Sequence, residues 1–181
     1  ILCTICLNYL PKVYIYPKMH YFMAVDIVDS GDNVIGQKSE LSSTFDKNAI
    51  TRASAVLVFN TEGKFLLQRR AKTKYRYPLF WDVSAAGFVD SGETYDHAAV
   101  RETEEELGIS VPFLDYLFKV FVQSDIKQFT GVYKLVSDGP FKPANDEVEE
   151  LQFVSIDELK AMIKAKENVT PFLITIFEEY E

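Results

Sequence analysis

The segment GFVDSGETYDHAAVRETEEELGI constrains this chain more than any other, because it places five glutamates and one arginine within 23 residues, from Gly87 to Ile109. Four of the glutamates fall in the run 102–106, which only Thr103 interrupts. Like charges three or four residues apart on a helix repel each other. A helix here must therefore turn some of these side chains apart or hold a cation among the others.

Residues 94–107 are predicted to form this helix, because Thr94 or Ser91 can cap its start and Gly108 can end it. At about 100° per residue, three carboxylates fall within an arc of roughly 100°: Glu102, Glu105 and Glu106. Glu104 points about 200° away from Glu102 and should be dispensable.

The rest of the helix predicts a buried stripe and an open patch. Val100, Thr103 and Leu107 lie together on another arc and are expected to face the core. Ala98 and Ala99 lie one turn before the carboxylates, and their small side chains are expected to leave room for a ligand.

Clustered carboxylate oxygens are the ligands that Mg²⁺ and Mn²⁺ prefer, and Mg²⁺ also binds water and phosphate oxygens. An acidic helix face exposed to solvent is the alternative for a charge run taken alone. Residues around the run favour a site, because Gly87, Gly92 and Glu93 precede the helix and Arg101 lies inside it.

These residues follow the pattern of the Nudix box, G-x5-E-x7-R-E-U-x-E-E-x-G-U, in which U is a bulky apolar residue. Its fixed positions are filled without a gap by Gly87, Glu93, Arg101, Glu102, Glu105, Glu106 and Gly108. Thr103 departs from the pattern at a helix-packing position, which does not bear on catalysis. The chain therefore resembles the Nudix hydrolase superfamily.

The resemblance implies a Nudix-type α/β/α sandwich with a mixed sheet, and a loop–helix–loop that binds divalent metal and hydrolyses a diphosphate linked to another moiety. It assigns the metal and catalysis to Glu102, Glu105 and Glu106, with Gly87 also at the metal. It gives structural roles to Glu93 paired with Arg101, and to Gly92, Gly108 and Gly87 in tight backbone. Mg²⁺ or Mn²⁺ would neutralise charge on the phosphate oxygens while water attacks phosphorus.

A further carboxylate outside the box assists metal binding or water activation in many members of this superfamily. The acidic loop DGPFKPANDEVEE offers Glu147, Glu149 and Glu150, with Asp146 beside them. Glu147 is the favoured catalytic candidate, followed by Glu150. A solvated loop before a strand is the alternative.

Residues 24–164 resemble the Nudix subgroup close to isopentenyl-diphosphate isomerase. That enzyme catalyses a different class of reaction, the movement of a double bond. Those isomerases need a cysteine before the box and a histidine-rich metal site. This chain has Ala85 and Ala86 in the matching segment, and Thr51 where a histidine is expected. The intact box and the missing cysteine favour hydrolysis over isomerisation.

The loop 69–76 holds five cations in eight residues. By the same resemblance, Arg70 and Lys74 match positions that contact a substrate diphosphate, which charged hydrogen bonds would hold. A loop exposed to solvent is the alternative. Trp81, just after the loop, is expected to pack structurally.

The rest of the chain predicts one α/β domain. Strands are expected at 24–29, 34–38, 53–60, 65–69, 114–123, 129–137 and 151–155, and helices at 155–165 and 170–181. The apolar run at 53–60 predicts a sheet covered on both faces.

The domain is expected to span residues 19–181, with residues 1–18 as an N-terminal extension. A net charge of −8 disfavours binding to a nucleic-acid polymer. No segment is long and apolar enough to cross a membrane, and the only cysteines are Cys3 and Cys6, so a cytoplasmic location is expected. A small-molecule diphosphate is the expected partner, and a homodimer is left open. A catalytically silent Nudix-fold module is disfavoured, because all the box glutamates are present.

Overall fold

The computed structural model describes residues 24–39, 42–43 and 46–181, so the expected extension 1–18 lies outside the described residues. Its helices and strands are β1 Ala24–Val28, β2 Val34–Ser39, β3 Ile50–Phe59, β4 Phe65–Arg70, β5 Trp81–Asp82, β6 Ala85–Phe88, α2 Tyr95–Leu107, β7 Asp115–Gln123, β8 Lys127–Val136, β9 Val148–Val154, α3 Ile156–Lys164 and α4 Pro171–Tyr180. None of the helices in this part of the chain has the length and apolar character to cross a membrane.

A mixed sheet lies at the centre of the domain. Its strands follow the order β5-β4-β3-β8-β7, while β6 also pairs with β3 and β9 with β4. Strands β3 and β8 run parallel, and the other neighbours run antiparallel. The predicted hairpin of β1 and β2 is present as a separate two-stranded sheet.

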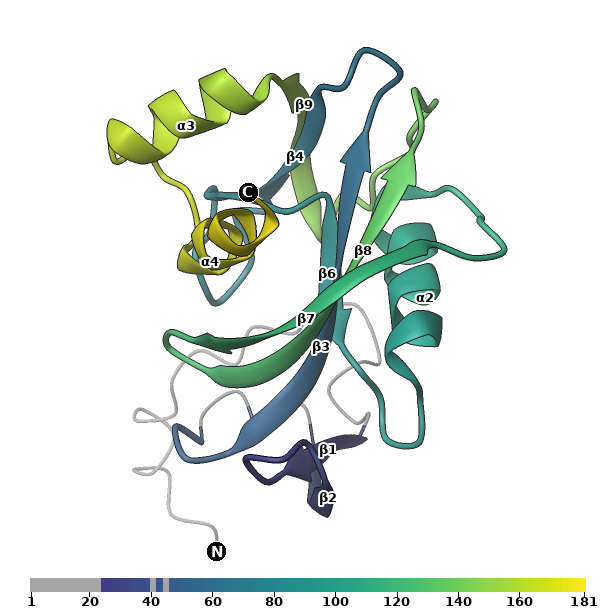
Figure 1. Ribbon diagram of the computed structural model, residues 1–181, viewed down its shortest axis with the longest axis vertical. Helices are drawn as coiled ribbons and strands as arrows, with labels where there is room; N and C mark the ends of the chain where they lie inside the picture. The colour runs from purple at the N-terminus through teal and green to yellow at the C-terminus, as the bar shows by residue number, and fades with distance from the viewer. Residues whose placement is uncertain (1–23, 40–41, 44–45) are drawn as a thin grey trace, which may run out of the picture.

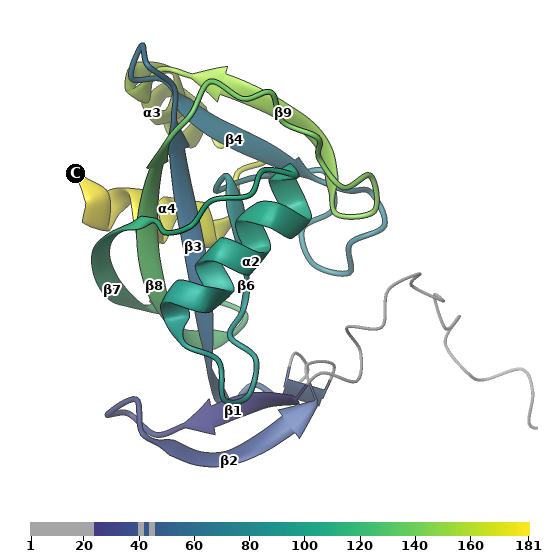
Figure 2. The ribbon, with the colours of Figure 1, turned by 90° about the vertical axis from the view of Figure 1, so that its right-hand side faces the viewer.

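Strand β3 is apolar from Ala55 to Phe59 because helices cover both faces of the sheet there. Leu57 and Phe59 belong to the core beneath α3 and α4, whereas Val56 and Val58 belong to the core beneath α2. Figures 1 and 2 show α2 on one face and α3 with α4 on the other. The expected α/β/α sandwich with a mixed sheet is confirmed.

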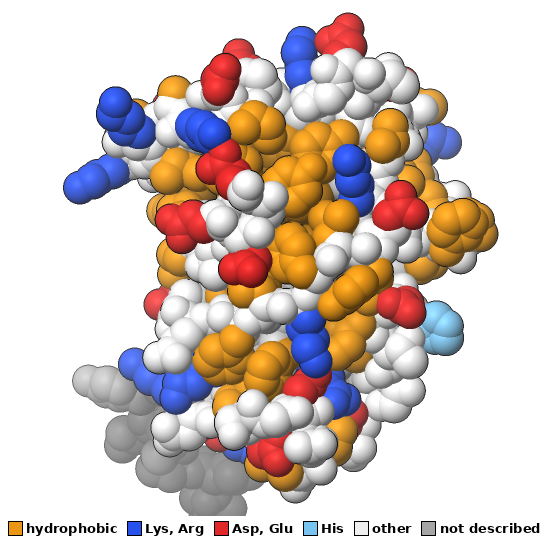
Figure 3. Space-filling view, viewed as in Figure 1, with side chains coloured by type: hydrophobic (Ala, Val, Ile, Leu, Met, Phe, Trp, Pro, Cys, Tyr) orange, Lys and Arg blue, Asp and Glu red, His pale blue; other side chains and the backbone are white. Residues whose placement is uncertain are grey.

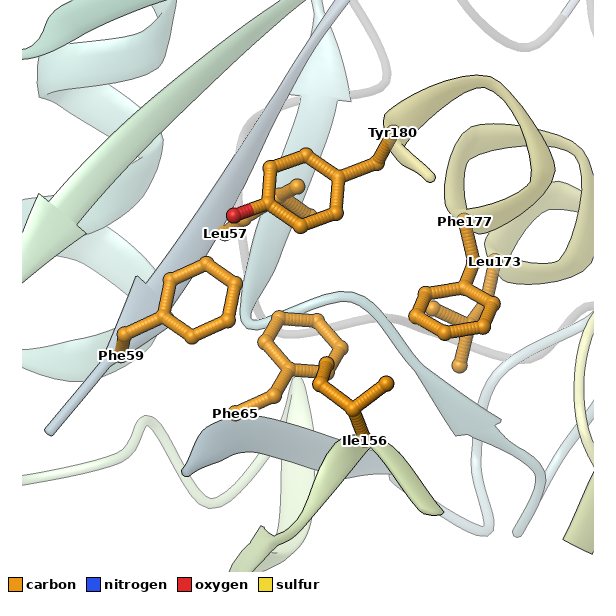
Figure 4. Close-up of a pocket in the computed structure, with 7 residues that line it drawn as sticks. All are labelled: Leu57, Phe59, Phe65, Ile156, Leu173, Phe177 and Tyr180. Atoms are coloured by element: carbon orange, nitrogen blue, oxygen red, sulfur yellow. The ribbon is translucent and has the colours of Figure 1, made fainter. Parts of the chain in front are cut away.

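The layer under α4 is closed by aliphatic and aromatic contacts. Figure 4 shows the side chains that meet there: Leu57, Phe59, Phe65, Ile156, Leu173, Phe177 and Tyr180. Hydrophobic side chains also gather across the middle of the face seen in Figure 3. Trp81 packs against this core, as expected from the sequence.

Both C-terminal helices are capped at their N-termini by a hydroxyl side chain. Ser155 and Glu158 form a capping box at α3. Thr170 caps α4, its hydroxyl oxygen accepting from the Leu173 N–H at 3.1 Å, and it donates to Asp82 Oδ1 at 2.8 Å. Thr170 is buried, so its hydroxyl satisfies an N–H at the start of α4 and a carboxylate oxygen that also accepts from the Val83 N–H.

Replacing Thr170 with valine keeps the shape but removes both hydrogen bonds, so we expect the free energy of unfolding to fall by about 2–3 kcal/mol. Thr170→Ser keeps the hydroxyl and should lose less than about 1 kcal/mol. Urea denaturation measures both. An equal loss in the two variants would show that the hydroxyl is not the source of the stability.

Candidate active site

Helix α2 begins and ends where the sequence predicts. Thr94 accepts a hydrogen bond from the His97 N–H at 3.3 Å, and Gly108 donates to the Glu104 carbonyl at 3.0 Å from a left-handed φ of 67°. A Cβ at position 108 would lie 2.5 Å from the Lys142 carbonyl oxygen, so both backbone angle and space require glycine. His97 is exposed.

The loop between β8 and β9 satisfies carbonyls at the end of α2. The Lys142 N–H donates to the Leu107 carbonyl at 2.8 Å, and the Ala144 N–H donates to the Glu106 carbonyl at 3.2 Å. The loop then meets β4, where the Ala71 N–H donates to the Glu147 carbonyl at 2.9 Å. These backbone contacts bring Glu147 to the carboxylate end of α2.

The carboxylates of α2 divide as the helical spacing predicts. Glu104 is exposed and Glu105 is half-buried, whereas Glu102 and Glu106 are only 8% and 5% exposed. Charged side chains are almost never buried to this extent unless they are paired. The two buried carboxylates therefore need specific partners.

The burial confirms that Thr103 and Leu107 face the core, but it corrects the rest of the expected orientation of the helix. Ala98 and Ala99 are fully buried and leave no room for a ligand, while Val100 is only half-buried. Helical spacing sets the angles between side chains but does not say which arc faces the sheet. Here the arc of Glu102 and Glu106 itself packs inward.

Arg101 connects the start of the segment to the helix. Its guanidinium donates to both Glu93 oxygens at 3.1 and 2.9 Å and to the Phe88 carbonyl at 2.9 Å. It also pairs with Glu102, and its Nη1 lies 3.6 Å from Glu105. The predicted pairing of Glu93 with Arg101 is present, and it fixes the loop before α2 against the helix.

Gly87 accommodates Glu102 rather than an unusual backbone angle. An added Cβ at Gly87 would lie 2.0 Å from Glu102 Oε1, and Gly87 is not among the residues with positive φ. The tight backbone expected at Gly87 therefore reflects the close approach of Glu102 and not a left-handed backbone angle. The requirement is steric, because the carboxylate of α2 lies directly on the β6 backbone. Gly92 has a φ of 80°, as a tight turn requires.

Strands β4 and β6 hold the Glu106 carboxylate. Its Oε2 accepts from Gln68 Nε2 on β4 and from the Ala86 N–H on β6, both at 3.0 Å. Burial raises the pKa of the Glu106 carboxyl, while nearby Lys74, the Ala86 N–H and Arg70 act to lower it. Burial, reinforced by the neighbouring Glu106 charge, raises the pKa of Glu102 to about 8.

Arg70 and Lys74, the two cations that the family resemblance matches to substrate contacts, lie close to these carboxylates. Lys74 pairs with Glu147. Arg70 donates to Asp82 Oδ2 at 3.2 Å and to the Arg76 carbonyl at 3.1 Å. The structure thus brings Lys74 and Glu147 together near Glu106, and it places Arg70 against buried Asp82.

The second acidic candidate lies differently. Glu150 is exposed on β9, and its Oε2 lies 3.4 Å from Arg69 Nη1. Glu147 is the better placed of the two, since it is half-buried, pairs with Lys74, and lies in the loop whose Ala144 N–H donates to the Glu106 carbonyl.

Sequence reasoning missed Gln68, whose amide holds Glu106. The signal was a glutamine within the apolar strand FLLQR, since a polar residue in a strand covered on both faces must find a buried partner. Sequence reasoning also missed Asp82, which is likewise a buried polar residue of the sheet.

The donor set has the chemistry of a divalent-metal site. Two neighbouring buried carboxylates, with Glu105 beside them on the helix, supply the hard oxygen ligands that such an ion binds. Within the described ranges, no three His, Cys, Asp or Glu side chains are already gathered in positions to hold one ion. Arg101, paired with Glu102, holds a positive charge there instead.

The comparison with known proteins decides the family. The NUDIX domain model matches residues 49–173. The chain belongs to the Nudix family. It is 37% identical to an uncharacterised Nudix hydrolase of Yersinia pestis over 138 residues, which cover 76% of this chain and 75% of that protein. It is 36% identical to Nudix hydrolase YfcD of Escherichia coli K12, over 76% of each chain.

The fold of the Nudix domain agrees. The crystal structure of DR0079 from Deinococcus radiodurans superposes with a TM-score of 0.76 at 27% identity, covering 86% of this chain and 98% of that one. The chain is therefore a Nudix pyrophosphohydrolase, of a family that hydrolyses nucleoside diphosphate derivatives and generally uses divalent metal ions.

Replacing Gly87 with alanine should displace Glu102, because the new methyl group would overlap its carboxylate. We expect the rate of diphosphate hydrolysis to fall at least about tenfold while the protein still folds. Gly36→Ala is the matched control, since a Cβ at Gly36 meets nothing within 4 Å. Steady-state rates and circular dichroism measure the two effects, and a fully active Gly87→Ala would contradict the steric argument.

Proposed function

We propose that this chain hydrolyses a nucleoside diphosphate linked to another moiety, or a related organic diphosphate, with Mg²⁺ or Mn²⁺ at the α2 carboxylates. The observation that supports this most is the burial of Glu102 and Glu106 beside each other, with Glu105 next to them. Two adjacent buried carboxylates are costly without a cation, and a divalent ion supplies one.

Each residue has a separate part in this proposal. Glu102, Glu105 and Glu106 hold the metal, and the backbone at Gly87 lies beside Glu102. When bound, the metal neutralises charge on the phosphate oxygens and lowers the pKa of a bound water. Glu147 accepts the proton of the water that attacks phosphorus.

Lys74 and Arg70 supply positive charge for the diphosphate. Lys74 pairs with Glu147 in the loop that contacts the end of α2, and Arg70 lies on β4 two residues after Gln68, which donates to Glu106. Phosphate oxygens can take the place of the carboxylates that these cations now contact, because an ammonium and a guanidinium bind either anion. Glu93 and Arg101 keep the loop in position and contact no substrate.

Glu106→Gln should reduce turnover by at least about 100-fold, because it removes a charged ligand whose metal stabilises the transition state by several kcal/mol. Glu104→Gln makes the same change at an exposed position on another face of the helix, and it should leave turnover within about twofold. Phosphate release with Mg²⁺ or Mn²⁺ is measured on nucleoside diphosphate sugars, dinucleotides, nucleoside triphosphates and isoprenoid diphosphates. Equal losses in the two variants would refute the assignment, as would a parent protein that hydrolyses none of these. Conversion of isopentenyl to dimethylallyl diphosphate would instead support an isomerase.

Lys74→Met should raise KM for the diphosphate about 10- to 100-fold, as expected for the loss of one charged hydrogen bond. Lys72→Met removes the same charge from an exposed position of the same loop and should change KM less than about twofold. Initial-rate kinetics at saturating metal separate KM from kcat. Matching KM values for the two variants would exclude Lys74 from substrate binding.

A further inference from the structure

Gln68 is a polar side chain in the core of the sheet. It lies in β4 between Leu67 and Arg69, pairs across the ladders with Leu151 and Asp82, and is 2% exposed. Burying an amide costs free energy unless hydrogen bonds compensate it. Among the described residues, the side-chain amide of Gln68 makes one hydrogen bond, from Nε2 to Glu106 Oε2 at 3.0 Å.

This bond acts together with a backbone donor on the same carboxylate oxygen. The Ala86 N–H reaches Glu106 Oε2 at 3.0 Å, so donors from β4 and β6 converge on one atom. Two donors on Oε2 fix the rotation of the carboxylate about its terminal bond. Glu106 Oε1 accepts neither of these hydrogen bonds and can therefore bind another partner.

The other end of the amide shows that Gln68 does little for stability alone. Gln68 Oε1 is buried and has no hydrogen-bond partner among the described residues. An unpaired buried acceptor destabilises the fold, and an apolar side chain of the same shape would avoid this cost. The contact with Glu106 is therefore the feature that accounts for an amide at this position.

We propose that Gln68 is a positioning residue of the metal site: its amide N–H orients Glu106 so that Oε1 is presented to the divalent ion. This inference rests on the proposed function, since it requires Glu106 to be a metal ligand. Outer contacts of this kind orient the ligand and are typically worth 10- to 100-fold in metal affinity.

The test is the dissociation constant for Mn²⁺, measured by calorimetry on the full chain without substrate. Gln68→Met keeps the volume and removes the amide, so Mn²⁺ should bind about 10- to 100-fold more weakly. Gln128→Met is the matched control. Gln128 is also buried, on β8, but its amide lies 3.3 Å from Thr130 Oγ1 and outside the site, so affinity should stay within about twofold of the parent.

A folded Gln68→Met that binds Mn²⁺ as tightly as the parent would overturn the proposal, as would an equal loss in Gln128→Met. If Gln68→Met does not fold, Gln68→Asn serves the same purpose, because its amide is one methylene too short to reach Glu106 and its affinity should also fall. Absence of Mn²⁺ binding in the parent would instead overturn the proposed function, and this inference with it.

Discussion

The guanidinium of Arg101 is the interaction on which the site depends. It contacts Glu93 and the Phe88 carbonyl in the loop, and Glu102 and Glu105 in the helix. Burial alone would disfavour a charged arginine, but its carboxylate partners raise the pKa of the guanidinium and keep it charged. Without this cation, the loop would lose its attachment to α2 and Glu102 would be a buried charge without its nearest partner.

The carboxylate pair imposes a second constraint. Glu102 and Glu106 face the sheet rather than water: Glu102 lies on Gly87 of β6, and Glu106 accepts from Gln68 of β4 and from the Ala86 N–H of β6. Backbone and side-chain donors partly compensate the buried charges, and the remaining cost decreases when a cation binds.

Several elements therefore converge on one end of α2. The β8–β9 loop caps the carbonyls of the helix and carries Glu147, while the β4–β5 loop carries Lys74 to meet it. Opposite charges thus lie beside the carboxylates that we propose as metal ligands. In the proposed reaction, binding exchanges these internal ion pairs for contacts with phosphate, which limits the reorganisation that substrate binding needs.

Much of this could be read from the sequence, because it depends on local rules. The boundaries of α2 follow from Thr94 and Gly108, the separation of Glu104 from the other glutamates follows from helical periodicity, and the spacing of the box identifies the family. The α/β/α layers follow from β3, whose apolar run needs cover on both faces.

The tertiary structure determined the features that local sequence rules do not specify. Helical periodicity relates side chains to one another but not to the sheet, so it could not show that Ala98 and Ala99 are buried or that Glu102 packs on Gly87. Gln68, Ala86 and Glu106 are far apart in the chain, and only strand pairing and helix packing bring them within hydrogen-bond distance. The residue types that do the chemistry are written in the sequence, whereas their orientation depends on contacts between elements distant along the chain.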